Sequence, residues 1–208
     1  MKTERTTVNR LPERGRYDRE TLYAILDEAP ICTVAFVREG TPVAIPTIHA
    51  RVDDQLYLHG STASTMLSSL AAGAEACVTA TILDGLVVAR SVFHHSMNYR
   101  SAIVLGRARD VADDDEKRNA MRAVVEHVLA GRWAEARKPN RREIAATRIV
   151  AIPIAEASSK VRTGPPIDDE EDLALPIWAG VVPTRLTPSA PVPATKAIAL
   201  PASVRNLV

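Results

Sequence analysis

The 208-residue sequence has little of what marks several large classes of protein. It has only two cysteines, and no run approaches the roughly 18 apolar residues that a membrane helix requires. It has no excess of charge either, with 26 basic and 25 acidic residues, so neither nucleic acid nor a membrane surface is expected as a partner. The charged N-terminus is followed by no apolar stretch, which predicts a cytoplasmic protein.

The motifs of the common catalytic and nucleotide-binding sites are also absent. Cys32 and Cys77 lie far apart in apolar runs, without a second Cys or a His at metal-ligand spacing, so we expect two buried free thiols and no metal site. The sequence contains no GxGxxG, no P-loop and no GxSxG. If the protein is an enzyme, a bound cofactor is therefore expected to carry the chemistry.

The hydrophobic pattern predicts an α+β domain built on an antiparallel sheet or barrel. Apolar residues recur at helical spacing in three segments, and alternation between turn signals predicts several strands. Asp84-Gly85 reads as a turn, Gly106 as a bulge, and the proline-rich sequence after Ser158 as largely irregular. The expected helices are 18–29, 61–73 and 113–130, and the expected strands are 31–37, 41–52, 55–60, 75–83, 86–90, 99–110 and 147–154.

The first segment that could carry chemistry is LHGSTAST, residues 58–65, where a strand gives way to a helix rich in hydroxyl groups. Unpaired backbone N–H groups and hydroxyls at a helix start can donate to phosphate oxygens. Ser and Thr are equally favoured there as ordinary helix caps. Both interpretations remain open from the sequence.

The second segment is RSVFHHSMNYRS, residues 90–101, which concentrates polar and aromatic side chains between strands. Such a group rarely belongs in a core, so it favours the lining of a site over a surface loop with incidental histidines. His94 and His95 are adjacent and point to opposite sides in a strand, which argues against a shared metal ion.

The third segment, residues 158–180, begins with Lys160 and Arg162 and contains Trp178. Residues two apart face the same way in an extended chain, so the two cations could converge on one anion. Trp178 could stack on a ring. The alternatives are that the cations pair with the acidic run 168–172 and that Trp178 anchors the tail to the barrel.

Together these segments resemble the FMN-binding split-barrel superfamily, and within it the pyridoxamine 5'-phosphate oxidase-related proteins that include the nitroimidazole-resistance group. The resemblance covers about residues 18–185. It is carried by IPTIHARVDDQLYLHGS, DGLVVARSVFHHSMNYRSAIVLGRAR, AGRWAEARKPNRRE and SSKVRTGPPIDDEEDLALPIWAGVVP, which are residues 45–61, 84–109, 130–143 and 158–183.

The resemblance implies a six-stranded antiparallel split barrel with flanking helices, a homodimer, and FMN in the grooves between subunits. Relatives often carry Arg or Lys just after the serine of the phosphate segment, where this chain reads Ser64-Thr65-Met66, so Arg90, Arg100 or Lys160 is expected to supply that cation. The implied FMN-binding residues are Pro46, Thr47, Ile48, His59, Gly60, Ser61, Ser64, Thr65, Arg90, His95, Asn98, Tyr99, Arg100, Ser101, Lys160, Arg162 and Trp178. The domain would span 18–185, between a lead-in at 1–17 and a proline-rich tail at 186–208.

The expected function is that of an FMN-dependent oxidoreductase that takes electrons from one small molecule and reduces another. Tyr99, His94, His95 and His59 are candidates to donate a proton or orient a substrate, although the sequence identifies no catalytic residue. The vitamin B6 oxidase reaction itself is not expected, because its substrate-phosphate cluster of arginine and histidine is not recognisable. The alternatives are a flavin carrier or redox sensor without turnover, and a split barrel that binds the deazaflavin F420 or haem.

Overall fold

The structure is a computed structural model that describes residues 1–195 and 198–208. Its strands are β1 (Gly15–Arg16), β2 (Cys32–Arg38), β3 (Thr41–Thr47), β4 (His49–Val52), β5 (Gln55–Ser61), β6 (Glu75–Val88), β7 (Ser96–Arg107), β8 (Arg109–Asp110), β9 (Thr147–Pro153), β10 (Glu156–Arg162) and β11 (Gly180–Pro183). Its α-helices are α1 (Arg19–Glu28), α2 (Thr65–Ala71), α3 (Asp114–Val128), α4 (Arg132–Glu135), α5 (Arg141–Ala146) and α6 (Ala202–Arg205). Three short 3₁₀ turns, η1 (Pro12–Arg14), η2 (Val92–His94) and η3 (Glu170–Asp172), complete the described elements. None of the helices in the described part of the chain is long and apolar enough to span a membrane.

Two antiparallel sheets together enclose the core. One runs in the order β1-β10-β7-β6-β2-β3 with β11 beside β6, and the other in the order β4-β5-β9-β8. The chain passes from one sheet to the other at three places, from β3 to β4 and from β7 to β8 through a single residue, and from β9 to β10 through the two-residue turn 154–155. Counting each such pair as one strand, the barrel consists of β2, β3–β4, β5, β6, β7–β8 and β9–β10. The expected six-stranded split barrel with flanking helices is confirmed.

Apolar alternation explains why these segments form the barrel. In β2 the buried residues are Cys32, Val34 and Phe36, every second position of the strand. Leu58 of β5 and Val150 of β9 are paired in register and fully buried. Helices α1 and α2 add apolar side chains to this core, among them Leu26 and Leu67.

The helices begin where the sequence supplies a cap. The side chains of Asp18 and Asp113 accept hydrogen bonds from backbone N–H groups in the first turns of α1 and α3, at 2.7 and 2.8 Å. Helix α3 covers the outer face of the smaller sheet with a second apolar cluster, which contains Tyr57, Ala120 and Ile149. Gly131, in the left-handed conformation, separates α3 from α4.

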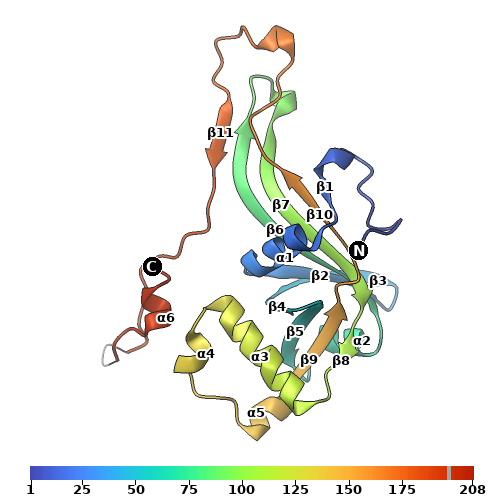
Figure 1. Cartoon of the computed structure of the whole chain (residues 1–208), viewed down its shortest axis with the longest axis vertical. Helices are drawn as coiled ribbons and strands as arrows, with labels where there is room; N and C mark the ends of the chain where they lie inside the picture. Colours follow the sequence, from blue (N-terminus) through green and yellow to red (C-terminus); the bar gives the residue numbers. More distant parts are fainter. Residues whose placement is uncertain (196–197) are drawn as a thin grey trace.

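Strands β6 and β7 continue beyond the barrel as a long ribbon, with β11 paired along the outer edge of β6 (Figure 1). We call this part, residues 83–100 and 163–183, the arm. It differs from the expected hairpin, because Asp84-Gly85 is not a turn. Leu83 pairs with Tyr99 and Gly85 with Asn98, which makes Asp84 an extra residue, a β-bulge within one strand.

Three further local predictions differ from the structure. Gly106 is no bulge, since it pairs in register with Ala76 and instead allows close approach to Ile152, whose Cγ2 would lie 3.3 Å from an added Cβ. The segment after Ser158 is not irregular at first, because β10 runs to Arg162. The expected proline-rich tail is not irregular throughout, because its short helix α6 packs against α4 through hydrogen bonds from Ser203 to Glu135. Lys196 and Ala197 of this tail lie outside the described residues.

Candidate functional site

The first group of candidate residues lies where β3 meets β4 and where β5 ends. Because His49 pairs with Leu58, Ile48 lies beside His59 on the neighbouring strand. Pro46 is exposed at the end of β3, and Thr47 and Ile48 are half-buried. Gly60 and Ser61 follow His59 along β5 toward α2. The structure therefore brings the expected ring wall and the expected phosphate segment next to each other.

Among the described residues of this group, His59 has a ring nitrogen without a hydrogen-bond partner. This nitrogen, Nδ1, is buried. Burial lowers the pKa of His59, because the charged imidazolium loses hydration there. At neutral pH His59 is therefore an uncharged imidazole that can accept a proton, donate a hydrogen bond or ligate a metal ion.

The hydroxyls before α2 are used locally. Ser64 is the N-cap, and its Oγ accepts a 3.4 Å hydrogen bond from the backbone N–H of Leu67. Ser61 Oγ accepts one of 3.1 Å from Ala63 N, and Thr65 is exposed. The ordinary helix-cap interpretation thus describes Ser64. Gly60 is required for close packing, since an added Cβ would lie 3.0 Å from Leu67 Cδ1.

A cation that the sequence reasoning missed lies against this segment. Arg148 of β9 is opposite Gly60 in the β5–β9 register, and its Nη1 donates a 2.7 Å hydrogen bond to Ser68 Oγ of α2. Nothing in the local sequence around Arg148 marks it. The signal that could have found it is the pairing of β5 with β9.

The second group of candidate residues lies along the arm and is held by polar contacts. Arg90 donates from its backbone N and from Nη1 to Asp168, at 2.8 and 2.9 Å, and this carboxylate is almost fully buried. His95 Nδ1 lies 3.0 Å from Ser91 O, and His94 Nε2 lies 3.0 Å from Asp169 Oδ2. The contacts of Arg90 and His94 hold the loop 163–179 against the ribbon of β6 and β7.

Arg162 is 6% exposed and contacts only neutral acceptors among the described residues. It donates to Asn98 Oδ1 and to the backbone oxygens of Gly164 and Pro165, the last two at 3.2 and 3.1 Å. Burial lowers the pKa of Arg162, and the nearby Arg14 cation adds to this effect. In the same strand Lys160 Nζ donates to Arg10 O at 3.1 Å, so Lys160 and Arg162 do not converge on one point within the chain.

Arg100 joins the arm to the barrel. It donates to Asp84 in the bulge and to Glu28 at the end of α1, each at 2.8 Å from Nη2. Its hydrogen bonds to Glu28 hold the pKa of that carboxyl below its usual range. The adjacent Ser101 donates from Oγ to Lys160 O at 3.3 Å, and Tyr99 is half-buried in β7.

Trp178 does not anchor the tail to the barrel. Its side chain is 64% exposed and lies over Gly180, where an added Cβ would be 2.9 Å from Trp178 Cζ2. Among the described residues, no hydrogen bond or ion pair joins the group around His59 to the group along the arm. One chain therefore presents the candidate residues as two separate groups.

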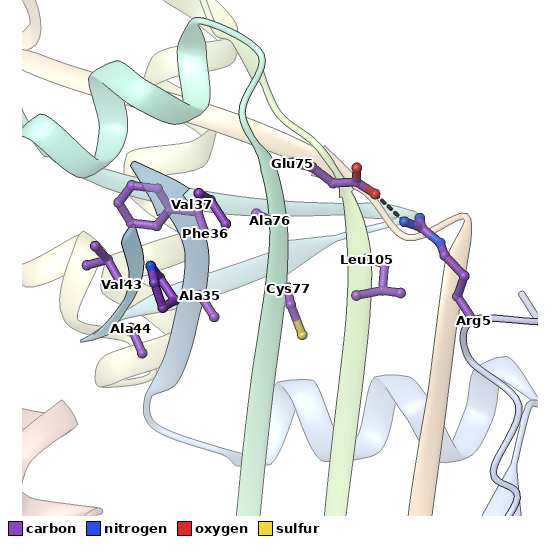
Figure 2. A pocket seen from close by; sticks show the side chains of 11 residues that line it. Arg5, Ala35, Phe36, Val37, Val43, Ala44, Glu75, Ala76, Cys77 and Leu105 are labelled. Atoms are coloured by element: carbon purple, nitrogen blue, oxygen red, sulfur yellow. Dashed lines mark hydrogen bonds and ion pairs between the residues drawn. The ribbon is translucent and has the colours of Figure 1, made fainter. Parts of the chain in front are cut away.

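The outer face of the larger sheet carries a shallow groove of about 430 Å³ near the barrel end of β2, β3 and β6. Small and apolar side chains from adjacent strands line it, with Arg5 paired to Glu75 at its rim (Figure 2). Cys77 is half-buried in this groove, and burial raises the pKa of its thiol. Cys32 is fully buried as expected, with its pKa raised to about 12 by burial. Both thiols are free.

The fold is a split β-barrel with polar groups gathered at the end of one strand and along a neighbouring ribbon. Residues 18–161 match the family model described as pyridoxamine 5'-phosphate oxidase. The chain belongs to the pyridoxamine 5'-phosphate oxidase family. The comparison with curated proteins finds no match.

Two solved structures resemble nearly the whole chain. The FAD and haem binding protein from Mycobacterium smegmatis has 44% identity and a TM-score of 0.89, over 93% of this chain and 97% of that one. The flavocytochrome Anf3 from Azotobacter vinelandii has 40% identity and a TM-score of 0.90, over 99% and 97% of the two chains. A candidate 5-nitroimidazole antibiotic resistance protein from Bacteroides thetaiotaomicron has 22% identity and a TM-score of 0.60, over 71% and 86%, and supports the fold alone.

Proposed function

We propose that this protein binds a flavin and uses it for electron transfer between small molecules. The observation that carries the proposal is the 40–44% identity, over nearly the full length, to two proteins named for FAD and haem binding and as a flavocytochrome. The resemblance in the sequence points to FMN, whereas the name of one of these relatives points to FAD. Both share the isoalloxazine ring and a phosphate.

The chain's own residues suit that cofactor in distinct ways. The backbone of 46–48 and the neighbouring His59 would form a wall for the ring, while Ser61, Ser64 and Thr65 offer hydroxyls to the phosphate. The bound flavin would supply the electron transfer. His59, kept neutral by burial, could hold or move a proton beside the ring.

We further propose a homodimer with the flavin at the subunit interface. Two observations support it. Among the described residues, no hydrogen bond or ion pair joins the two groups of candidate residues, so a second copy could bring the arm of one subunit to the barrel of the other. The arm also exposes adjacent apolar side chains at its tip, where Val92 is 90% and Phe93 is 85% exposed.

The first experiment is to purify the protein and record its absorbance spectrum. The expected result is flavin absorbance, with FMN or FAD released on denaturation and identified by mass spectrometry. Colourless protein that takes up neither added flavin would refute the proposal. Turnover with NAD(P)H and small electron acceptors would support an oxidoreductase, whereas stoichiometric flavin without turnover would favour a carrier or a redox sensor.

Haem binding in addition to flavin is the second candidate function. Both relatives above are named for a haem or cytochrome function, and His59 has a neutral imidazole with nitrogens that no described residue binds. A Soret band in the isolated or haem-reconstituted protein is the expected result. In that case His59→Ala should shift the Soret band, whereas His94→Ala on the arm should not.

A further inference from the structure

The expected phosphate segment lies in the longest part of the chain without a cation. No Lys or Arg occurs from residue 52 to residue 89, a stretch that includes all of β5, α2 and β6. A flavin phosphate carries negative charge, and a charge-assisted contact is roughly twice as strong as a neutral one. A cation for the phosphate must therefore come from another part of the fold.

The cations that the sequence suggested for this role have other partners in the chain. Arg90 is paired with Asp168 and Arg100 with Glu28 and Asp84. Lys160 donates to Arg10 O, in the segment before β1, the strand that pairs with β10 in the larger sheet. None of these contacts lies at the end of β5.

Arg148 is the cation that the fold does bring there. It lies opposite Gly60, one residue before Ser61, and its guanidinium reaches Ser68 Oγ at 2.7 Å. Its side chain is 30% exposed, which leaves donors that solvent or a ligand can reach. The nearest carboxylate, Asp110, is 3.8 Å from Nε and half-exposed, so it neutralises Arg148 only weakly.

We propose that Arg148 binds the flavin phosphate and thereby selects phosphorylated flavins over riboflavin. This inference rests on the proposed function. Arg148 supplies the positive charge that residues 52–89 lack. The hydroxyls of Ser61, Ser64 and Thr65 complete the contact with the phosphate. Since a guanidinium can donate to Ser68 and to a phosphate oxygen at once, binding does not require α2 to move.

The test compares FMN with riboflavin, which differ only in the phosphate. Dissociation constants are measured by quenching of flavin fluorescence for the wild type, Arg148→Met and Arg148→Lys. Arg107→Met is the matched control, because Arg107 is also an exposed cation beside α2 and donates to Gly73 O at the helix's other end. Circular dichroism and thermal unfolding check that each variant is folded.

Loss of a hydrogen bond to a charged group predicts that Arg148→Met weakens FMN binding about 10- to 100-fold. Riboflavin binding should not change, Arg148→Lys should retain part of the FMN affinity, and Arg107→Met should behave as the wild type. The salt dependence of FMN binding should also decrease in Arg148→Met, because one phosphate contact is lost.

Equal weakening of FMN and riboflavin would overturn the inference, because it would mean that Arg148 only holds α2 in place. Unchanged binding of both flavins by a folded Arg148→Met variant would overturn it as well. Failure of the wild type to bind any flavin is a different result, because it refutes the proposed function itself. The wild-type measurement therefore separates the two failures.

Discussion

In the barrel, the side chains that pack together are almost all apolar, whereas the arm combines a few buried apolar side chains, such as Val87 and Ala89, with ionic and polar contacts between its segments. Leu58, Val150 and Leu26 are fully buried in the barrel core. In the arm, Arg90 pairs with Asp168, and Asn98 donates to Gly164 O and accepts from Arg162 at the base of the arm. The barrel is therefore stabilised mainly by burial of apolar area, whereas the arm depends more on strand pairing and on polar contacts that are sensitive to geometry and salt.

This difference bears on where a ligand could act. A packed apolar core resists change, since removing one methylene leaves a cavity. The arm joins the barrel through Arg100 and ends in exposed apolar side chains. We infer that the barrel serves as the rigid support of the candidate site and that the arm is the part whose position a partner or cofactor could influence.

The largest expected effect comes from the barrel core. Leu58→Ala should lower the free energy of unfolding by about 2 to 5 kcal/mol, because Leu58 is fully buried and its truncation leaves a cavity. Leu86→Ala on the arm, where Leu86 is 44% exposed, should cost less than about 1 kcal/mol. Urea unfolding measures both. Similar losses in the two variants would contradict the contrast between barrel and arm.

The second prediction concerns His49, a buried polar residue in the barrel. His49 Nε2 is 2.8 Å from Leu26 O, its ring is 4.8 Å from that of His127, and burial lowers its pKa to about 4. The Leu26 carbonyl and the Asp27 carboxylate oppose this lowering of the His49 pKa, whereas His127 adds to it. The unfolded chain, with a histidine pKa near 6.5, therefore binds more protons than the folded chain between about pH 4 and 6.5.

Stability should consequently be complete above about pH 6.5 and should fall by about 1 to 3 kcal/mol as the pH is lowered to 4. Urea unfolding at a series of pH values measures this slope. His49→Gln should flatten it, whereas His94→Gln, at the tip of the arm, should leave it in place. A slope that persists in His49→Gln would show that other groups cause it.

The third prediction tests the junction between arm and barrel. Arg100→Met should lower stability by about 1 kcal/mol, since Arg100, Glu28 and Asp84 are all partly exposed and solvent screens their interaction. The loss should be smaller in high salt, and amide exchange near Asp84 should become faster. Arg118→Met removes an exposed ion pair on α3 and is the control. Equal exchange rates in both variants would argue against a joining role for Arg100.

The contrast also explains how far the sequence could predict the structure. The helix predicted at 113–130 is found at Asp114–Val128, since its apolar stripe and its caps are local signals. Strand β10 was missed because its buried positions include Ala157, Ser158 and Ser159, which do not look like a core strand. Apolar periodicity predicts elements that pack by apolar burial and overlooks those buried with small or polar residues.

The candidate site could be predicted only in part for a similar reason. The segments around His59 and Asn98 stand out because their polar residues are crowded along the chain. Arg148 gives no such signal, because its place beside Gly60 follows from the pairing of β5 with β9. The bulge at Asp84 was read as a turn, since Asp-Gly has the same local signature, and the contact that explains it comes from Arg100.

The smallest expected effect on the stability of the single chain comes from the tip of the arm. Phe93 is 85% exposed, so Phe93→Ser should change the free energy of unfolding by no more than about 0.5 kcal/mol. In the proposed homodimer the same change should raise the dissociation constant of the dimer at least about tenfold, because aromatic anchors dominate interfaces. Analytical ultracentrifugation measures this constant, with Val192→Ser, at a 94% exposed position in the tail, as the control. If Phe93→Ser and Val192→Ser both dimerise as the wild type does, the tip of the arm is not part of the dimer interface. Any contact between the arm and the bound flavin would then have to be made within one subunit.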